Sequence, residues 1–220
     1  MLVLALDTAT AGVVVGLARV GSDVAVLVER RGGGPPRHGE AVSPGIHAVL
    51  TEAGHSPEEL AAVVVGVGPG PFTGLRVGMV SAAALADALA IPVYGVGSLD
   101  ATVLGLPDPS GRVVVAADAR RREVYWAVYD EGLRVDGPHV SAPATVGDVL
   151  AGHSGARLVG AGAVLHGLPG AQDAGPTVAG LVAAAGTELT AGRPAGPLVA
   201  AYLRRPDATE STARIPAAPA

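Results

Sequence analysis

The hydrophobic residues of this chain fall into short runs that are separated by turns rich in glycine and proline. The first run, residues 2–6, is continuously apolar and ends at Asp7. Runs of this length bounded by turn residues are typical of β-strands. Further strands are predicted on the same grounds at residues 13–19, 23–29, 61–67 and 92–96.

Two longer segments have the pattern of helices. His38–Ala53 carries Ile46, Val49 and Leu50 at helical spacing, and residues 75–90 form an Ala-rich apolar run. Three strands followed by alternating strands and helices predict an α/β lobe with a mixed sheet.

The most distinctive segment runs from Gly66 to Gly78 and reads Gly-Val-Gly-Pro-Gly-Pro-Phe-Thr-Gly-Leu-Arg-Val-Gly. It joins a predicted strand to the Ala-rich helix, and such turns expose backbone N–H groups where anions often bind. The Walker motif needs a lysine, which the chain lacks, and the dinucleotide fingerprint fails at Pro71 or Thr73. We therefore expect a structural turn, in which Thr73 caps the helix and the prolines stiffen its entry.

Composition narrows the possible chemistry. The chain has 220 residues, 49% of them hydrophobic, which is enough for one or two domains. All 15 basic residues are arginine and there is no cysteine, which excludes lysine nucleophiles, thiol catalysis, disulfides and cysteine-ligated zinc. The net charge of −5 argues against a dominant nucleic-acid footprint, and we interpret the one dense basic spot, Arg120-Arg121-Arg122, as a solvated turn.

The pattern at the N-terminus predicts a strand rather than a signal peptide, because the apolar run begins without a charged segment before it. The longest apolar stretch, residues 77–91, is interrupted by Asp87 and is not expected to span a membrane. We therefore expect a cytoplasmic protein.

The second half of the chain begins like the first. Residues 113–118 are an apolar run ending in Asp118, and like Asp7 this aspartate is followed by five turn residues and a six-residue strand. The repeat has a period of about 111 residues, although strand–Asp–turn–strand is a common arrangement that also arises by chance. It predicts two lobes, residues 1–100 and 101–205, and a disordered Pro/Ala/Thr-rich tail at 206–220.

Two lobes that each open with a strand–Asp–hairpin resemble the actin-like ATPase (ASKHA) superfamily, which implies a two-lobed α/β fold built from duplicated mixed-sheet lobes. In that superfamily the hairpins hold nucleotide phosphates through glycine and hydroxyl residues after each aspartate. Here Asp7, Thr8 and Thr10 flank an alanine, and Asp118 is followed by Ala119-Arg120. The resemblance therefore implies a degenerate nucleotide site; a metal shared by the two aspartates remains an alternative, although turn-capping roles are favoured.

A narrower resemblance follows from three motifs: residues 4–10, Gly68-Pro-Gly-Pro-Phe-Thr-Gly-Leu-Arg-Val-Gly, and Asp118-Ala-Arg-Arg-Arg-Glu-Val-Tyr. They are similar to the TsaB (YeaZ) family of bacterial tRNA threonylcarbamoyladenosine biosynthesis proteins, historically grouped with M22 glycoprotease-like proteins. Pro71 stands where that family usually has serine, and extra residues separate Pro197 from the late Tyr202-Leu-Arg motif.

The resemblance implies a non-catalytic subunit that supports the transferase TsaD in forming threonylcarbamoyladenosine (t6A) beside the tRNA anticodon. TsaD carries a His-x-x-x-His metal pair, and the equivalent residues 94–101 of this chain contain no histidine. No catalytic, cofactor-binding or metal-binding residue is therefore expected here, since ATP and metal would belong to the partner. The ATPase TsaE is an implied further partner, a homodimer is an implied state of the isolated chain, and contact with tRNA would be indirect.

The Ala-rich helix offers a surface for such a partner. Gly74, Gly78, Ala82 and Ala86 recur every four residues, a pattern that allows close approach of another helix. Packing of this stripe within its own lobe remains the alternative. The predicted partner interface comprises Ile46, Val49, Leu50, Gly74, Arg76, Gly78, Met79, Ala82 and Ala86. Replacing Gly78 with leucine is expected to abolish association and leave the lobe folded.

Two other functions are alternatives to this one. A stand-alone small-molecule kinase or transferase of the actin-like fold would need an open phosphate hairpin, which the Ala119-Arg120 turn disfavours. A peptidase would need His-Glu-x-x-His or Gly-x-Ser-x-Gly, and the sequence contains neither.

Overall fold

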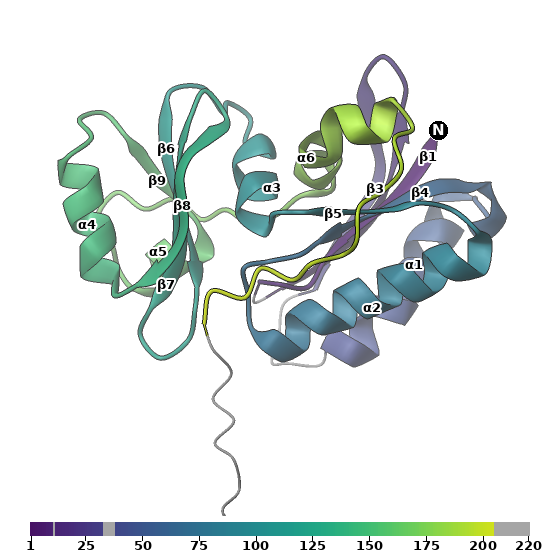
Figure 1. The fold of residues 1–220 in the computed structure, drawn as a ribbon, viewed down its shortest axis with the longest axis horizontal. Helices are drawn as coiled ribbons and strands as arrows, with labels where there is room; N and C mark the ends of the chain where they lie inside the picture. Colours follow the sequence, from purple (N-terminus) through teal and green to yellow (C-terminus); the bar gives the residue numbers. More distant parts are fainter. Residues whose placement is uncertain (11, 33–37, 205–220) are drawn as a thin grey trace, which may run out of the picture.

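The computed structural model describes residues 1–10, 12–32 and 38–204. In these residues the chain forms two α/β lobes, with the short helix α3 (Ser98–Leu104) between them (Figure 1). The tail predicted at 206–220 lies outside the described residues.

The first lobe is built on a five-stranded sheet in the order β3-β2-β1-β4-β5. Its antiparallel half comprises β1 (Leu2–Asp7), β2 (Val13–Val20) and β3 (Val24–Gly32). The strands β4 (Leu60–Gly66) and β5 (Val93–Val96) add to β1 in parallel. The predicted mixed sheet is confirmed.

The second lobe repeats this arrangement with one strand fewer. Its sheet has the order β8-β7-β6-β9, in which β6 pairs antiparallel with β7 and parallel with β9, as β1 does with β2 and β4. The bounds are β6 (Arg112–Asp118), β7 (Val124–Asp130), β8 (Leu133–Ser141) and β9 (Arg157–Val159). The predicted internal repeat is therefore a repeat of topology.

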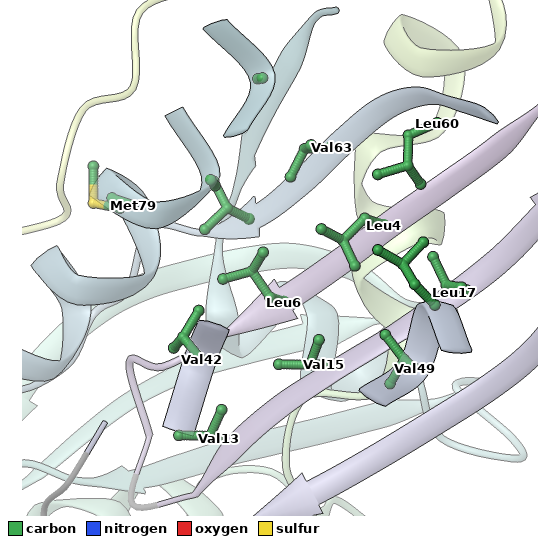
Figure 2. Packing of buried hydrophobic residues seen from close by; sticks show 14 of the residues in the cluster. Leu4, Leu6, Val13, Val15, Leu17, Val42, Val49, Leu60, Val63 and Met79 are labelled. Atoms are coloured by element: carbon green, nitrogen blue, oxygen red, sulfur yellow. The ribbon is translucent and has the colours of Figure 1, made fainter. Parts of the chain in front are cut away.

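One face of the first sheet is covered by α1 (His38–Ala53) and α2 (Phe72–Leu89), with a 3₁₀ turn at Pro57–Glu59 between α1 and β4. Figure 2 shows the core that results, where Leu4, Leu6 and Val15 of the sheet pack with Val42 and Val49 of α1. Burial of such side chains is worth about 1.5–3 kcal/mol each. The strands and helices therefore form because their apolar positions meet here.

By length and composition α2 is the one helix in the described ranges that could cross a membrane, with a mean hydropathy of 1.3 over Phe72–Leu89. Its inner face carries Leu75 and Met79 into the core of the first lobe. We interpret α2 as a core helix, because such helices have the same length and composition.

The other face of the first sheet is covered by α6 (Val178–Thr190), which comes from near the end of the chain. Its Val178, Leu181 and Leu189 pack against Val3 and Val64 of the sheet. The division predicted at residue 100 is therefore incomplete: after the second lobe, the chain returns to the first. The local sequence of α6 could not show which sheet the helix covers.

The residues after α6 form a segment that we call the C-terminal strap, residues 193–204. It begins where the Tyr94 hydroxyl donates to the Arg193 carbonyl (2.9 Å), and its Leu198 and Ala200 pack on the first core. The Ala201 amide donates to the Val67 carbonyl over 2.8 Å. In Figure 1 the strap runs across the first lobe and ends between the two lobes.

The second lobe has a core of its own around Trp126, covered by α4 (Pro143–Ala151) and α5 (Ala161–Leu165). On its other face, Leu99 and Val103 of α3 pack with Val113 and Val115 of β6 and with Tyr129 of β7. The Tyr129 hydroxyl donates to Asp100 Oδ1 (2.8 Å), which raises the pKa of this buried phenol further than burial alone does. The helix α3, which the sequence pattern did not predict, therefore joins the lobes.

Candidate functional site: two hairpin turns and the cleft between them

The first hairpin turn follows β1 and is buried. Asp7 Oδ1 accepts from the Ala9 amide (2.9 Å), and Asp7 Oδ2 accepts from the Ser98 hydroxyl (2.5 Å). The Ser98 oxygen also accepts from the Gly68 amide over 3.2 Å. Asp7 thus holds the end of β1, the glycine turn and the start of α3 together, which agrees with the favoured turn-capping role.

Thr8 enters the backbone of α2. Its hydroxyl donates to the Gly74 carbonyl (2.7 Å) and accepts from the Gly78 amide (3.0 Å), two groups that are spaced four residues apart. In a regular helix these two groups bond to each other, so the Thr8 hydroxyl bridges the donor and the acceptor of one helical hydrogen bond. A Cβ on Gly78 would come within 2.3 Å of Thr8 Oγ1. Gly78 is therefore needed to admit Thr8.

The glycine turn packs directly on the first hairpin turn. A Cβ on Gly66 would lie 1.8 Å from Asp7 Oδ2, and one on Gly70 would lie 2.0 Å from the Ala9 carbonyl oxygen. These close contacts support the structural role expected of this turn. The predicted capping role of Thr73 is wrong, because α2 begins at Phe72 with Pro71 as its N-cap, which places Thr73 inside the first helical turn.

The second hairpin turn follows β6 and projects outward. Arg120, Arg121 and Arg122 are all exposed and have φ values of 60°, 56° and 61°, the left-handed region. The turn is closed by bonds from the Ala119 amide to the Glu123 carbonyl and from the Glu123 amide to the Arg120 carbonyl, both 3.0 Å. The resemblance to a phosphate hairpin ends here, since neither a glycine nor a hydroxyl stands in the turn.

Asp118 caps this second turn as Asp7 caps the first. Its Oδ1 accepts from the Arg120 amide (3.0 Å), its Oδ2 lies 3.5 Å from Arg120 Nη1, and His166 Nε2 lies 3.7 Å from Oδ1. Burial raises the pKa of Tyr125 on β7, and the negative charge of Asp118 raises it further. The carboxylate of Asp118 is thereby committed to contacts within its own lobe.

A cleft of about 220 Å³ lies between the lobes and is lined by Thr10 of the first turn, by Asp118 and by Gly160 and Asp173 of the second lobe. Ligand pockets generally have volumes of about 300–1,000 Å³, so this one is small for a nucleotide. Asp118 lines it and Asp7 does not. In the described ranges no three His, Asp or Glu side chains gather as metal ligands.

The predicted partner interface needs correction. Seven of its nine residues are buried, so they cannot form an exposed face: Val49, Leu50, Gly74, Gly78, Met79, Ala82 and Ala86. The small-residue stripe of α2 packs within its own lobe, where Thr8 inserts between its glycines. Of the remaining two, Ile46 is half-buried and Arg76 is exposed. The expectation that Gly78→Leu leaves the lobe folded is wrong for the same reason.

The solvent side of α2 is a different set of residues, which we call the α2 outer face: Thr73, Arg76, Val80, Ala84 and Asp87. Val80 is 66% exposed. The sequence pattern could not select this face, because α2 is apolar nearly all round.

At the start of α2 the outer face continues into an aromatic cluster. The rings of Phe72 and Tyr202 stack with centroids 5.4 Å apart, and the Arg76 guanidinium lies 3.8 Å from the Phe72 centroid. Arg76 Nε also donates to the Tyr202 hydroxyl over 2.7 Å. The two rings are 46% and 44% exposed. This cluster was missed as a site, although Tyr202 belongs to a motif noted in the sequence.

Two sheets of the same strand order, each opening with an aspartate-capped hairpin beside a common cleft, define a two-lobed actin-like ATPase fold. The fold is shared with the solved structure of YeaZ from Pseudomonas aeruginosa, at a TM-score of 0.75 and 28% identity over 92% of this chain and 99% of that one. The chain belongs to the family described as "TsaD: tRNA N6-adenosine threonylcarbamoyltransferase", whose model matches residues 29–189, and within it to the TsaB (YeaZ) branch.

Two proteins with similar sequences show how this chain compares with its relatives. An uncharacterized protein of Mycobacterium tuberculosis (strain H37Rv) is 50% identical over 94% of this chain and 93% of its own length. The tRNA threonylcarbamoyladenosine biosynthesis protein TsaB of Escherichia coli K12 is 38% identical over 59% of this chain and 55% of its own length.

Proposed function

We propose that this chain is a non-catalytic accessory subunit in the formation of t6A beside the tRNA anticodon, and that it binds and supports a transferase of the TsaD type. The observation that carries the proposal is the second hairpin turn. Arg120 to Arg122 occupy the position where a nucleotide-binding hairpin of this fold keeps small and hydroxyl residues. A chain of this fold without that hairpin has lost its means of holding phosphates in the cleft.

The small cleft also supports the proposal that nucleotide chemistry takes place in the partner and not in this chain. At about 220 Å³ it is below the usual volume for a ligand of nucleotide size, and the Asp7 carboxylate is occupied by Ser98 and the Ala9 amide. In this proposal ATP and metal act in the partner, TsaE joins the assembled complex, and the isolated chain can pair with a second copy. The complex would work in the cytoplasm, where its tRNA substrate is found.

The α2 outer face is the surface that we assign to the transferase. It places an exposed valine and an arginine beside two half-exposed aromatic rings, and interface cores are enriched in aromatic residues and arginine. Arg76 belongs to the interface predicted from the sequence, and Val80 takes the place of the buried glycines and alanines. The transferase is favoured as occupant because the chain belongs to the family that contains it.

The test is a substitution in the centre of this face. Val80→Glu places a charge in a desolvated contact, so we expect loss of co-purification with the transferase, by about tenfold or more in affinity. The side chain is 66% exposed, so thermal stability is expected to stay unchanged. The matched control is Val135→Glu on β8, where the valine is 56% exposed and far in sequence from α2. Equal co-purification of both variants would refute the assigned surface.

A further inference from the structure

The three arginines of the second hairpin turn adopt a conformation that does not suit them. Three consecutive residues with side chains lie in the left-handed region, at φ values of 60°, 56° and 61°. This region crowds the Cβ atom against the backbone, and glycine or asparagine occupies it more readily than arginine. Stability alone would therefore favour other residues here. Positions that break a local rule in this way are where function is to be sought.

The turn is also firmly held. Besides its two backbone bonds and the Asp118 cap, Arg204 of the C-terminal strap donates from Nη1 to the Ala119 carbonyl (2.8 Å) and forms an ion pair with Glu123. These contacts fix the backbone and leave the three arginine side chains exposed. Three consecutive exposed arginines suit several anionic groups along a chain better than one small anion.

The charge of the turn contrasts with that of the protein. The chain carries a net charge of −5, and Arg120-Arg121-Arg122 is its one run of three cations. In the described residues, the turn and its ion-pair partners carry four arginines, Arg120, Arg121, Arg122 and Arg204, against the two carboxylates Asp118 and Glu123. Guanidinium groups bind phosphate through paired hydrogen bonds. A phosphate backbone therefore meets a local positive patch on an otherwise acidic protein.

We propose that the arginine turn, residues 120–122, binds the phosphate backbone of RNA. This inference rests on the proposed function, which brings a tRNA to the complex. It departs from our interpretation of the triplet as a solvated turn. RNA fits better than a nucleotide in the cleft, because the side chains project from the turn and the cleft measures only about 220 Å³.

The experiment uses the full chain and a fluorescently labelled, unmodified tRNA transcript, with binding followed by anisotropy between about 50 and 200 mM salt. In the test variant Arg120, Arg121 and Arg122 all become asparagine, which tolerates the left-handed backbone. We expect affinity to fall by about tenfold or more and the slope of log affinity against log salt to decrease by about 2. The melting temperature is expected to equal or exceed that of the wild type, which a merely structural role for these arginines would not allow.

The matched control removes three exposed arginines elsewhere, as Arg19→Gln, Arg30→Gln and Arg134→Gln, and is expected to retain most of the affinity. Equal losses in both variants would overturn the proposal, as would a wild-type chain that binds no tRNA. It would also be overturned if the asparagine variant lost only ATP-Mg binding, or lost only co-purification with the transferase. The proposed function fails separately, when the wild-type chain does not associate with the transferase.

Discussion

The two hairpin turns occupy equivalent positions in the two lobes, but the first is buried and the second is exposed. The first is buried, and its aspartate and threonine are joined to α2, to α3 and to the glycine turn. The second projects into solvent with three arginines, and its aspartate is joined to its own turn. The same strand–Asp–strand arrangement therefore forms buried contacts in the first lobe and an exposed surface in the second.

The two turns differ from a phosphate-binding hairpin in different ways. In the first turn, the polar groups that could face a phosphate have protein partners instead: Thr8 bonds to α2 and Asp7 to Ser98. In the second, the small residues that would let a phosphate approach are absent. Substitutions can test each half of this contrast.

The largest effect is expected where the first turn meets α2. Gly78→Ala brings a Cβ within 2.3 Å of Thr8 Oγ1, and because Thr8 is buried and β-branched it cannot move aside. We expect destabilisation of about 1–3 kcal/mol in urea unfolding. Gly147→Ala in α4 is the matched control, since a Cβ there meets nothing within 4 Å, and it is expected to stabilise the protein by about 1 kcal/mol. Equal effects would show that the Thr8 contact is unimportant.

A smaller effect is expected from the threonine itself. Thr8→Val keeps the shape and removes the hydroxyl that joins the Gly74 carbonyl to the Gly78 amide. We expect a loss of about 1–2 kcal/mol in the free energy of unfolding. Thr10→Val, in the same turn but only partly buried, is expected to change stability by less than about 0.5 kcal/mol. The reverse order would contradict the bridging role of Thr8.

The smallest effect is expected in the second hairpin, where Tyr125 reports on Asp118. Burial is the larger cause of its raised pKa and the Asp118 charge the smaller. Asp118→Asn should therefore lower the Tyr125 pKa slightly and leave it above the ordinary value of 10.0. The Tyr125 Cζ shift in ¹³C NMR measures this, with Asp130→Asn, at the other end of β7, as control. A rise in the pKa would contradict the assignment.

The sign of the accompanying stability change follows from linkage. The folded state keeps the Tyr125 proton to a higher pH than the unfolded state does. Its contribution to stability is therefore fully present below pH 10 and is lost as pH rises through the folded-state pKa. Asp118→Asn lowers the folded-state pKa slightly, so this alkaline loss should end at a slightly lower pH and be slightly smaller.

Much of the fold could be predicted from local patterns. The apolar runs that end at Asp7 and Asp118 predicted the repeat of strand, turn and strand. The apolar patterns of residues 38–53 and 75–90 predicted α1 and α2, because such signals lie within a few residues. The short helices α3 and α5 were not predicted, since seven and five residues give too little periodicity. The return of α6 to the first sheet was missed because it depends on contacts between residues far apart in the chain.

The site was harder to predict, and the error at α2 shows why. A helix that is apolar on nearly all sides has no contrast from which to choose its inner face. The choice is made by Thr8, which lies 70 residues before Gly78 in the chain. The glycines were correctly recognised as signs of close approach, but the approaching group is a side chain of the same lobe.

The return of α6 also bears on how the protein is made. The face of the first sheet that carries Val3 and Val64 is covered by α6, whose residues leave the ribosome after the whole second lobe. During synthesis this apolar face stays exposed until α6 has been made, and exposed sheet surfaces of this kind favour aggregation. A chain shortened before Val178 would lack the cover altogether, so the first lobe, although first in sequence, is the last to be completed.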